Sequence, residues 1–405
     1  MTMLDRVEKD RKSLPETVAQ TTFKGVPRAC LAEPAVRLTE VRLEHFRNLA
    51  DVGLEVPAEG VVLVGANGQG KTNFLEAIHY LSRFRSFRGS AHVDAVAFGA
   101  EHFRIEAGFV SDGRSRTLAV SADRERRRIV LDDSPVGRPS EVAGTLLAVS
   151  LRPEDLELVT GSPSARREYV DELLGLASRP YRRAIAEYDR VLRQRNELLR
   201  SGRGAAQLEA WDESLISSGV PIVIARAHLV GRLADRFERT AGRVAENNGY
   251  AIAYRPSVPV DPAAAARESD VREAWSHALV DRYEVDRVRG WTTIGPHRDE
   301  LEIVKDGRGL ARFGSQGECR TAAVALRLME AELLEADTGR RPILLLDDVF
   351  SELDGGRGER LLDWLGDRHQ RFVTSPRPLA WLTDGLAAWT VSEGRIECPA
   401  PAAAG

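Results

Sequence analysis

The chain has 405 residues, of which 43% are hydrophobic and 29% are charged, and its formal net charge is −4. This length allows two or three domains, and the composition is typical of a soluble globular protein. With a sequence pI of about 6.1, the chain as a whole lacks the basic character of a nucleic-acid-binding protein, so any such surface must be local.

The three cysteines, Cys30, Cys319 and Cys398, are scattered and have no paired spacing or histidine cluster. This distribution argues against a disulfide framework and against a structural zinc site. We find no apolar stretch of the ~18 to 20 residues that cross a bilayer, and the first 35 residues lack a signal-peptide core. The sequence therefore indicates a reduced, cytoplasmic protein without a membrane partner.

The ordered chain is expected to begin near Val36. Residues 1–35 mix charged residues and proline without periodicity, so we interpret them as a flexible extension, and residues 398–405 as a flexible tail. From Val36 to Phe46 apolar and polar residues alternate, and the pattern resumes from Val52 to Val56. This alternation predicts half-buried strands.

A phosphate loop follows these strands. Residues 65–72 match the G-x-x-x-x-G-K-[ST] motif in full, after the apolar run Val61–Val64 and before apolar residues at helical spacing. Its amides and the Lys71 charge suit nucleotide phosphates, and the Thr72 hydroxyl suits Mg²⁺. The expected nucleotide-binding residues of the loop are Gly65, Ala66, Asn67, Gly68, Gln69, Gly70, Lys71 and Thr72.

A second half of the site is expected far along the chain. The apolar run Ile343–Leu346 ends in Asp347 and Asp348. Asp347 is placed to hold Mg²⁺ at the carboxyl end of a parallel strand, and Asp348 to orient or deprotonate the attacking water. With Lys71, these two aspartates are the predicted catalytic residues, and the site is assembled from both ends of the chain.

The intervening chain predicts the domain organisation. Short strand-like runs at 103–110, 117–120 and 129–131 suggest a meander, and residues from Glu154 to about Asn247 form a long helical pattern that breaks at Ser201–Gly204. We predict an α/β protein in which residues 36–150 and 291–397 form one ATPase head. Residues 151–290 form an inserted short helical arm of two antiparallel segments.

Ser315, Gln316 and Gly317 form a turn before an amphipathic helix that runs to Leu334. A hydroxyl and free amides at a helix N-terminus suit a γ-phosphate, and because the first site has its own loop, we expect this turn to serve the nucleotide of a second subunit. A plain helix cap is the alternative. Asp354 and Thr374 are predicted to sense the γ-phosphate, with a solvated strand end as the alternative for Thr374.

These segments together resemble the RecF family, short-armed relatives of the SMC-type ATPases within the ABC class. The stretches that carry the resemblance are Leu43–Asn48, the phosphate loop, Arg85–Arg88, Pro153–Leu156, Gly161–Pro163, Arg166–Arg167, Thr292–Leu301, Gly314–Gly317 and Leu346–Asp354. Gly295–Asp299 together with Ser315–Gly317 is the most specific combination.

The resemblance implies an ATP- and Mg²⁺-dependent, slowly hydrolysing protein that forms a homodimer on nucleotide. It implies binding to gapped, double-stranded and single-stranded DNA, and help in loading RecA with RecR and RecO. It also implies that Arg47 and Asn48 contact the nucleotide. Two departures concern regulation: Glu318 and Cys319 stand where the family usually has two glutamines, and only Glu154 or Asp155 remains to replace the glutamine that senses Mg²⁺ in related ATPases.

Two basic clusters are candidate DNA contacts. One lies beside the phosphate-loop helix and contains Arg83, Arg85 and Arg88; the other lies in the arm, where residues 179–203 carry eight arginines against three acids, and contains Arg182 and Arg183. Such charge can bind DNA phosphates, although charge runs on helices are commonly solvated faces. Few aromatic residues accompany them, which favours backbone recognition over base reading.

Three other functions compete with an ATP-gated DNA clamp. A transporter ATPase subunit needs membrane partners and a Leu-Ser-Gly-Gly-type signature, which Gly314–Gly317 does not match. A defence ATPase of the overcoming-lysogeny type usually carries a nuclease module after the head. A RecF-like paralogue that uses ATP only as a dimerisation switch is suggested by Asp348, Glu318 and Cys319.

Overall fold

The structure is a computed structural model that describes residues 35–89, 91–202, 205–245, 247–260, 267–352, 355–366, 368–378 and 385–399. The chain divides into two compact units. Among the described residues, the head unit comprises residues 35–154 and 330–399, and the arm unit comprises residues 155–329. Residues 1–34 of the predicted extension, all but the first two residues of the predicted tail, Cys30 and Asp354 lie outside the described residues, whereas Ala35, the last residue of the predicted extension, pairs with Arg341.

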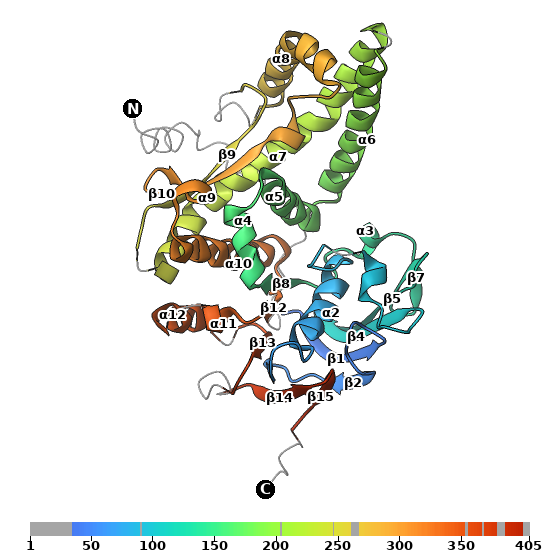
Figure 1. Ribbon diagram of the computed structural model, residues 1–405, viewed down its shortest axis with the longest axis vertical. Helices are drawn as coiled ribbons and strands as arrows, with labels where there is room; N and C mark the ends of the chain where they lie inside the picture. Colours follow the sequence, from blue (N-terminus) through green and yellow to red (C-terminus); the bar gives the residue numbers. More distant parts are fainter. Residues whose placement is uncertain are drawn as a thin grey trace. The chain divides into compact units, whose positions relative to one another are not determined.

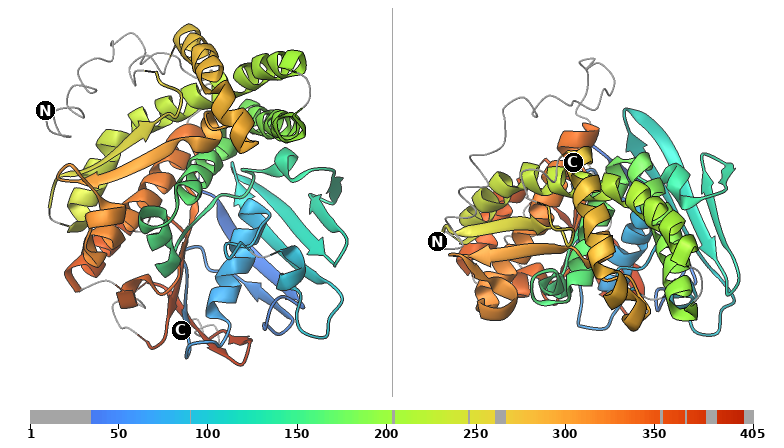
Figure 2. Two further views of the ribbon diagram at one scale, coloured as in Figure 1. Left: turned by 45° about the horizontal axis from the view of Figure 1, so that its top comes forward. Right: turned by 90° about the horizontal axis from the view of Figure 1, so that it is seen from above.

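The first sheet of the head unit is antiparallel, with the strand order β2-β1-β4-β5-β6-β7. Its strands are β1 (Arg37–Glu44), β2 (Val52–Glu55), β4 (Phe103–Ser111), β5 (Arg114–Ala122), β6 (Arg127–Leu131) and β7 (Ser134–Val136). The alternation in β4, where every second residue is buried, is that of a strand with one face against a core. The expected meander is confirmed, and its long members β4 and β5 run side by side in Figures 1 and 2.

The second sheet of the head unit has the order β15-β14-β3-β13-β12-β8 and is parallel except for β15. Its strands are β3 (Gly60–Val64), β8 (Ala148–Leu151), β12 (Ile343–Leu346), β13 (Arg371–Ser375), β14 (Ala387–Ser392) and β15 (Arg395–Glu397). Strand β3 pairs with β13 on one side and β14 on the other. The two ends of the chain therefore share this sheet, as the sequence predicts.

Helix α2 (Lys71–Arg83) packs against strands of both sheets, including β4 and β5 of the first and β8 and β13 of the second. Its buried face carries Phe74, whose ring meets those of Phe372 and Trp389, and Tyr80, whose ring meets Phe103. The smaller elements of this unit are the 3-10 helix η2 (His92–Ala95) and helices α3 (Pro139–Val142), α11 (Val349–Glu352) and α12 (Gly355–Leu365). The phosphate-loop helix is thus the centre of the head core.

The arm unit is mainly helical. Its helices are α4 (Glu157–Thr160), α5 (Pro163–Ala177), α6 (Arg179–Ser201), α7 (Ala205–Ala245), α8 (Glu268–Arg289) and α9 (Leu310–Phe313), with the 3-10 helix η4 (Pro296–Arg298). The 3-10 helix η3 (Pro153–Leu156) and helix α10 (Gln316–Thr338) each belong to both units along the chain. A small antiparallel sheet has the order β11-β10-β9, with β9 (Tyr250–Arg255), β10 (Glu300–Lys305) and β11 (Arg308–Gly309).

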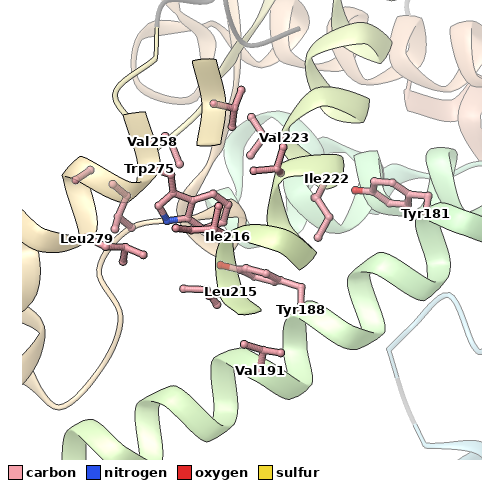
Figure 3. Packing of buried hydrophobic residues seen from close by; sticks show 14 residues of the cluster. Tyr181, Tyr188, Val191, Leu215, Ile216, Ile222, Val223, Val258, Trp275 and Leu279 are labelled. Atoms are coloured by element: carbon pink, nitrogen blue, oxygen red, sulfur yellow. The ribbon is translucent and has the colours of Figure 1, made fainter. Parts of the chain in front are cut away.

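The expected break between the two arm helices is confirmed, because α6 ends at Ser201 and Gly202 follows with a φ of 64°. Helices α6 and α7 lie side by side (Figures 1 and 2). Trp275 of α8 packs with Tyr188 of α6 and with residues of α7 such as Ile216 and Val223 (Figure 3). Burial of these large side chains removes apolar surface from water, which stabilises the fold by about 25 cal/mol per Å² buried and holds the helices together.

Two arm elements, α8 and β9, were not predicted from the sequence. Helix α8 was missed because its many charged residues obscure an apolar pattern with helical spacing. The residues of that pattern are buried in the structure, and they are Val271, Trp275, Ala278 and Leu279. Strand β9 follows α7 after a short gap. Strand β9 pairs with β10, and residues 291–329 belong to the arm unit, whereas the expected domain division ends the arm at Gly290.

Helix α7 also departs from the expectation that no segment is apolar enough to cross a membrane. Its segment Leu208–Ala245 is long and apolar enough by length and composition. Half of its most apolar window is buried inside the structure, and residues such as Leu215, Val220 and Ile222 belong to the arm core. A single helix of this kind is weak evidence for a membrane span, because the core helix of a soluble protein has the same properties.

Candidate nucleotide-binding site

The phosphate loop connects β3 to α2 and is shaped by glycines. Gly68 and Gly70 have φ values of 81° and 115°, a region that other residues rarely adopt. A Cβ atom on Gly70 would also lie 2.8 Å from the Leu49 side chain and 3.1 Å from Asn48 Oδ1. The loop ends at the N-terminus of α2, where backbone N–H groups suit an anion.

Lys71 is held at the mouth of this loop. Its Nζ donates hydrogen bonds to the carbonyl oxygens of Gly65 and Ala66, at 2.6 and 2.9 Å. Burial lowers the pKa of Lys71, while the negative charges of Asp348 and Asp347 oppose that shift. The ammonium group is thereby aligned with both the loop and the two aspartates.

Asp347 joins the two halves of the site. Its Oδ1 accepts hydrogen bonds from Thr72 Oγ1 at 3.0 Å and from Thr374 Oγ1 at 2.8 Å. Burial raises the pKa of Asp347, the two threonine hydroxyls lower it, and the charges of Asp348 and Glu154 raise it. The carboxyl ends of β12 and β13 thus meet the start of α2, as expected for a ligand edge of a parallel sheet.

Asp348 has an unusual backbone and an open side-chain atom. Its φ is 52°, a left-handed conformation that aspartate tolerates better than most residues and that Asp112, Asp132, Asp133 and Asp306 also adopt. Its N–H donates to Thr374 Oγ1 at 2.8 Å, and its Oδ1 is buried without a hydrogen-bond partner in the described part of the chain. A buried, unpaired carboxylate oxygen is costly unless a ligand or water engages it.

These oxygens fit a magnesium ion. Mg²⁺ is usually held by one or two protein ligands together with phosphate oxygens and water, and Thr72 and Asp347 supply two such oxygens at one place. Among the residues that the structure describes, no group of three or more His, Cys, Asp or Glu side chains forms a metal site of its own. The site therefore suits a metal that arrives with the nucleotide.

Thr374 is placed differently from its predicted role. It is buried, and its hydroxyl donates to Asp347 while accepting from the Asp348 N–H. This geometry makes it a residue that positions both aspartates. Its role as a γ-phosphate sensor stays a prediction, and so does that of Asp354.

Arg47 and Asn48 follow β1 and lie beside the loop helix. Arg47 donates to the fully buried carboxylate of Glu76 at 2.6 and 3.2 Å, and to the Asp94 carbonyl at 2.5 Å. Asn48 donates from Nδ2 to the Gly68 carbonyl at 3.2 Å and accepts from Asn73 at 2.6 Å. Both side chains therefore support the site from outside; a direct contact of either with nucleotide stays a prediction.

The C-terminal hairpin also grips the loop, which sequence reasoning missed. The N–H of Gly394 donates to the carbonyl of Gln69 at 3.0 Å. The N–H of Glu393 donates to the side-chain Oε1 of Gln69 at 2.5 Å. A Cβ atom on Gly394 would lie 1.9 Å from the Asn48 carbonyl oxygen. The only sequence signal was the glycine in the turn between two short alternating runs.

The predicted signature turn is closed by its own helix. Glu318 Oε2 accepts hydrogen bonds from the Ser315 N–H and hydroxyl at 2.8 and 2.9 Å, and the Glu318 N–H donates to Ser315 Oγ at 3.3 Å. Lys305 pairs with Glu318 Oε1 at 3.1 Å. The hydrogen bonds from Ser315 and Lys305 lower the pKa of Glu318. This reciprocal arrangement is a capping box, so the helix-cap alternative describes Ser315 here; Gln316 and Gly317 start α10 beside it.

The segment Gly295–Asp299 is mostly buried in the arm. Arg226 donates to Asp171 with Nε at 2.9 Å and to Asp299 with Nη1 at 3.0 Å, and it also donates to the Pro296 carbonyl at 2.7 Å. We call Arg226 with Asp171, Asp299, Tyr181 and Tyr254 the Arg226 cluster.

His297 Nε2 faces the Thr292 carbonyl at 3.0 Å, so that nitrogen carries the proton and Nδ1 accepts from the Tyr188 hydroxyl at 2.7 Å.

The basic residues differ in their exposure. Arg83 is 7% exposed and pairs with Glu330, and Arg195 of the arm is fully buried against Asp286 and Asp212. Arg88 pairs with Glu76 and Asn73. Arg182 donates to the Gly175 carbonyl, whereas Arg85 and Arg183 are exposed. Most described arginines of the arm cluster are nevertheless exposed, namely Arg179, Arg183, Arg190, Arg193 and Arg200. The DNA-binding roles of all five predicted residues stay predictions.

Comparison with known proteins decides the family. Residues 37–380 match the RecF/RecN/SMC N-terminal domain. The DNA replication and repair protein RecF of Frankia alni is 39% identical over 358 residues, which cover 84% of this chain and 93% of that protein. The chain belongs to the RecF family.

Other members and structures agree with this assignment. The DNA replication and repair protein RecF of Gloeobacter violaceus is 36% identical over 377 residues, covering 90% of this chain and all of that protein. A solved structure described as the recombination mediator protein RecF with ATP in the RecFOR pathway is 31% identical, with a TM-score of 0.84 over 92% of this chain and 100% of that chain. An SMC head structure, at 15% identity and a TM-score of 0.51, shows the shared ATPase-head fold alone and covers 90% of this chain and 97% of that chain.

Proposed function

We propose that this protein is an ATP-dependent DNA-binding protein of recombinational repair and replication. In this proposal ATP drives two heads together on gapped or junction DNA, hydrolysis is slow, and the protein works in the cytoplasm. The observation that carries the proposal is the hydrogen-bonded edge of Thr72, Asp347 and Thr374 beside a complete phosphate loop, in a chain of the RecF family.

Nucleotide binding rests on the loop. The N–H groups at the start of α2 and the Lys71 ammonium supply positive charge for phosphates. Thr72 and Asp347 would hold Mg²⁺, which when bound neutralises phosphate charge as the bond to the γ-phosphate breaks. Among the described residues, Thr374 keeps both aspartates oriented through its two hydrogen bonds.

Hydrolysis is assigned to Asp348. Its buried Oδ1 has no partner in the described part of the chain, so it is free to accept a proton or a hydrogen bond from the attacking water. An aspartate is one methylene shorter than a glutamate at this position, which supports slow turnover.

Dimerisation and DNA binding extend the proposal beyond the single chain. The turn at Ser315, Gln316 and Gly317 would meet the nucleotide of a second copy. One solved relative is described as the recombination mediator protein RecF with ATP in the RecFOR pathway, which supports RecR, RecO and the loading of RecA as partners. Gapped, double-stranded and single-stranded DNA are the proposed ligands. The exposed arginines of the two basic clusters include Arg85, Arg88 and Arg183.

The decisive experiment measures self-association and gapped-DNA binding together, with and without ATP and Mg²⁺. The natural protein is expected to dimerise and bind gapped DNA more tightly with ATP, and Lys71→Ala to lose both responses. DNA binding that is equally tight without ATP, by a protein that stays monomeric with ATP, would contradict the proposal.

A second candidate is a RecF-like paralogue or defence ATPase that uses ATP only as a dimerisation switch, and the residues that suggest it are Asp348, Glu318 and Cys319. In either candidate, the contact of Glu318 with Ser315 must open before the Ser315 hydroxyl and N–H can meet a γ-phosphate. ATP turnover of the natural protein, with and without DNA, separates the candidates when it is compared with that of Asp348→Ala. Equal rates would mean that no hydrolytic cycle exists.

A further inference from the structure

The outer side of the phosphate loop is reached by a chain of three side chains. Arg88 donates from Nη2 to Asn73 Oδ1 at 2.7 Å, Asn73 donates from Nδ2 to Asn48 Oδ1 at 2.6 Å, and Asn48 donates from Nδ2 to the Gly68 carbonyl at 3.2 Å. All of these residues belong to the head unit. We call Arg88, Asn73 and Asn48 the relay.

The start of the relay is firmly anchored. Glu76 is fully buried, lies 3.5 Å from Arg88 Nη1, and also binds Arg47 and the Ser86 hydroxyl. The Ser86 hydroxyl in turn accepts a hydrogen bond from the Arg88 N–H at 3.0 Å. Although 42% of the Arg88 side chain is exposed, its guanidinium is engaged by two partners within the head.

The relay has a direction that Arg88 sets. A guanidinium only donates hydrogen bonds, so the Asn73 atom that faces it must be the oxygen, and the Asn73 NH₂ group must face Asn48. Asn48 then presents its oxygen to Asn73 and its NH₂ group to the Gly68 carbonyl. Without a donor at position 88 both amides are free to turn over, and an oxygen of Asn48 facing the Gly68 carbonyl would be repulsive.

The orientation of the Gly68 carbonyl matters for phosphate binding. The C=O and N–H of a planar trans peptide point in opposite directions, so a carbonyl held toward Asn48 turns the Gln69 N–H to the other side of the loop. The Gln69 carbonyl is held in the same way by the Gly394 N–H at 3.0 Å. Loop N–H groups that are fixed before binding cost less to order when an anion arrives.

We propose that Arg88 is a positioning residue for nucleotide binding, acting through Asn73 and Asn48 on the Gly68 peptide of the phosphate loop. This inference rests on the proposed function, because it presumes that the loop binds nucleotide. It gives Arg88 a role inside the head in place of the DNA contact that its charge suggested.

The test measures the affinity of the full-length protein for ATP with Mg²⁺ by calorimetry. One variant removes the donor at position 88, and another turns the Asn73 donor into an acceptor. Arg88→Ala and Asn73→Asp are each expected to weaken ATP binding about 5- to 10-fold, the worth of one typical hydrogen bond. Arg88→Lys keeps a donor and is expected to stay within about twofold of the natural protein. The double variant Arg88→Ala with Asn73→Asp is expected to be no weaker than Asn73→Asp alone, because both changes break one relay.

Several results decide the matter. KM for ATP is expected to rise while kcat at saturating ATP is unchanged, a split that general destabilisation would not give. The matched control, Arg124→Ala, removes an exposed arginine of the same unit and should bind ATP normally. Normal ATP affinity of Arg88→Ala, an Arg88→Lys variant as weak as Arg88→Ala, or multiplying effects in the double variant would each overturn the inference.

The inference and the proposed function fail separately. If Lys71→Ala binds ATP as well as the natural protein does, the loop is not the nucleotide site and both fail. If Lys71→Ala no longer binds ATP while Arg88→Ala binds ATP with the affinity of the natural protein, only the inference fails. Loss of DNA binding in Arg88→Ala with unchanged ATP affinity would assign Arg88 to DNA and also overturn the inference.

Discussion

The nucleotide-binding edge of the head and the Arg226 cluster of the arm both gather buried polar side chains, but they treat them in opposite ways. At the edge, Asp348 keeps a buried oxygen that has no hydrogen-bond partner among the described residues. In the arm cluster, all three guanidinium nitrogens of Arg226 donate hydrogen bonds, and both oxygens of Asp299 accept them. The difference between these two sites is that the Asp348 oxygen stays available to a ligand, whereas the groups of the Arg226 cluster are occupied by one another.

Replacing Arg226 tests the completed cluster and has the largest expected effect. Arg226→Leu leaves Asp171 and Asp299 without their shared cation, and removing one partner of a buried ion pair typically costs about 3 to 5 kcal/mol of unfolding free energy. Urea denaturation measures this loss. Arg183→Ala, an exposed arginine of the same unit, serves as the control with less than about 0.5 kcal/mol expected. A loss below about 1 kcal/mol for Arg226→Leu would mean that the cluster does not hold the arm together.

The pH dependence of stability sharpens the comparison next. Burial is the main cause that lowers the pKa of His297 from 6.5 to about 4. A depressed histidine pKa contributes stability that is present above pH 6.5 and is lost as the pH falls toward 4, because the unfolded chain binds the proton first. The contribution approaches about 3 kcal/mol. Denaturation at pH 7 and pH 4.5 should show a smaller acid loss for His297→Asn, with exposed His277→Asn as the control; an unchanged acid loss would contradict this.

The nucleotide edge is expected to behave in the reverse way. Burial raises the pKa of Asp347, so its charge disfavours the folded state at neutral pH and that penalty disappears as acid protonates the carboxylate. Asp347→Asn keeps the oxygen that the two threonines bind and should raise Tm by about 1 to 3 °C at pH 7.5 without nucleotide, with no gain at pH 4. Thermal melting measures this, with exposed Asp363→Asn as the control. Asp347→Asn should also lose Mg²⁺-dependent ATP hydrolysis. A lower Tm of Asp347→Asn at pH 7.5 would show that Asp347 is a structural residue.

The smallest expected effect concerns the capped signature turn, which belongs with the completed polar groups. Glu318→Gln removes the charge that Ser315 and Lys305 satisfy and weakens the capping box by about 0.5 to 1 kcal/mol. We expect ATP-driven self-association to tighten about threefold because the Ser315 hydroxyl is released more easily. Analytical ultracentrifugation with ATP measures it, and Glu284→Gln is the control. Weaker association would instead make Glu318 a direct part of the dimer contact.

The sequence was sufficient for the features that local patterns encode. The phosphate loop, the apolar strand before Asp347 and the strand that ends near Thr374 were all predicted correctly, because each combines a buried run with chemistry at its end. The break after Ser201 followed from a glycine that adopts a positive φ. Such signals depend on neighbours in the chain alone.

Features that depend on distant neighbours were not predictable in the same way. The pairing of Arg47 with buried Glu76, the double hydrogen bond of Thr374 and the burial of Arg195 each require the tertiary fold. A charge count treats a buried arginine such as Arg195 and an exposed one such as Arg183 alike, so it could not tell which of them lies at the surface. Residue type showed which groups carry chemistry, and only packing showed which are already occupied.

The place of β3 in its sheet has a consequence for biosynthesis. Its two neighbours, β13 and β14, are synthesised about 300 residues after it. The arm unit, by contrast, is formed by one stretch of the sequence, from Asp155 to Met329. At roughly 5 to 20 residues per second, the ribosome needs about 15 to 60 seconds to supply those partners. The arm can therefore fold on the nascent chain while β3 waits with exposed edges, which makes the newly made head the part that most needs chaperones.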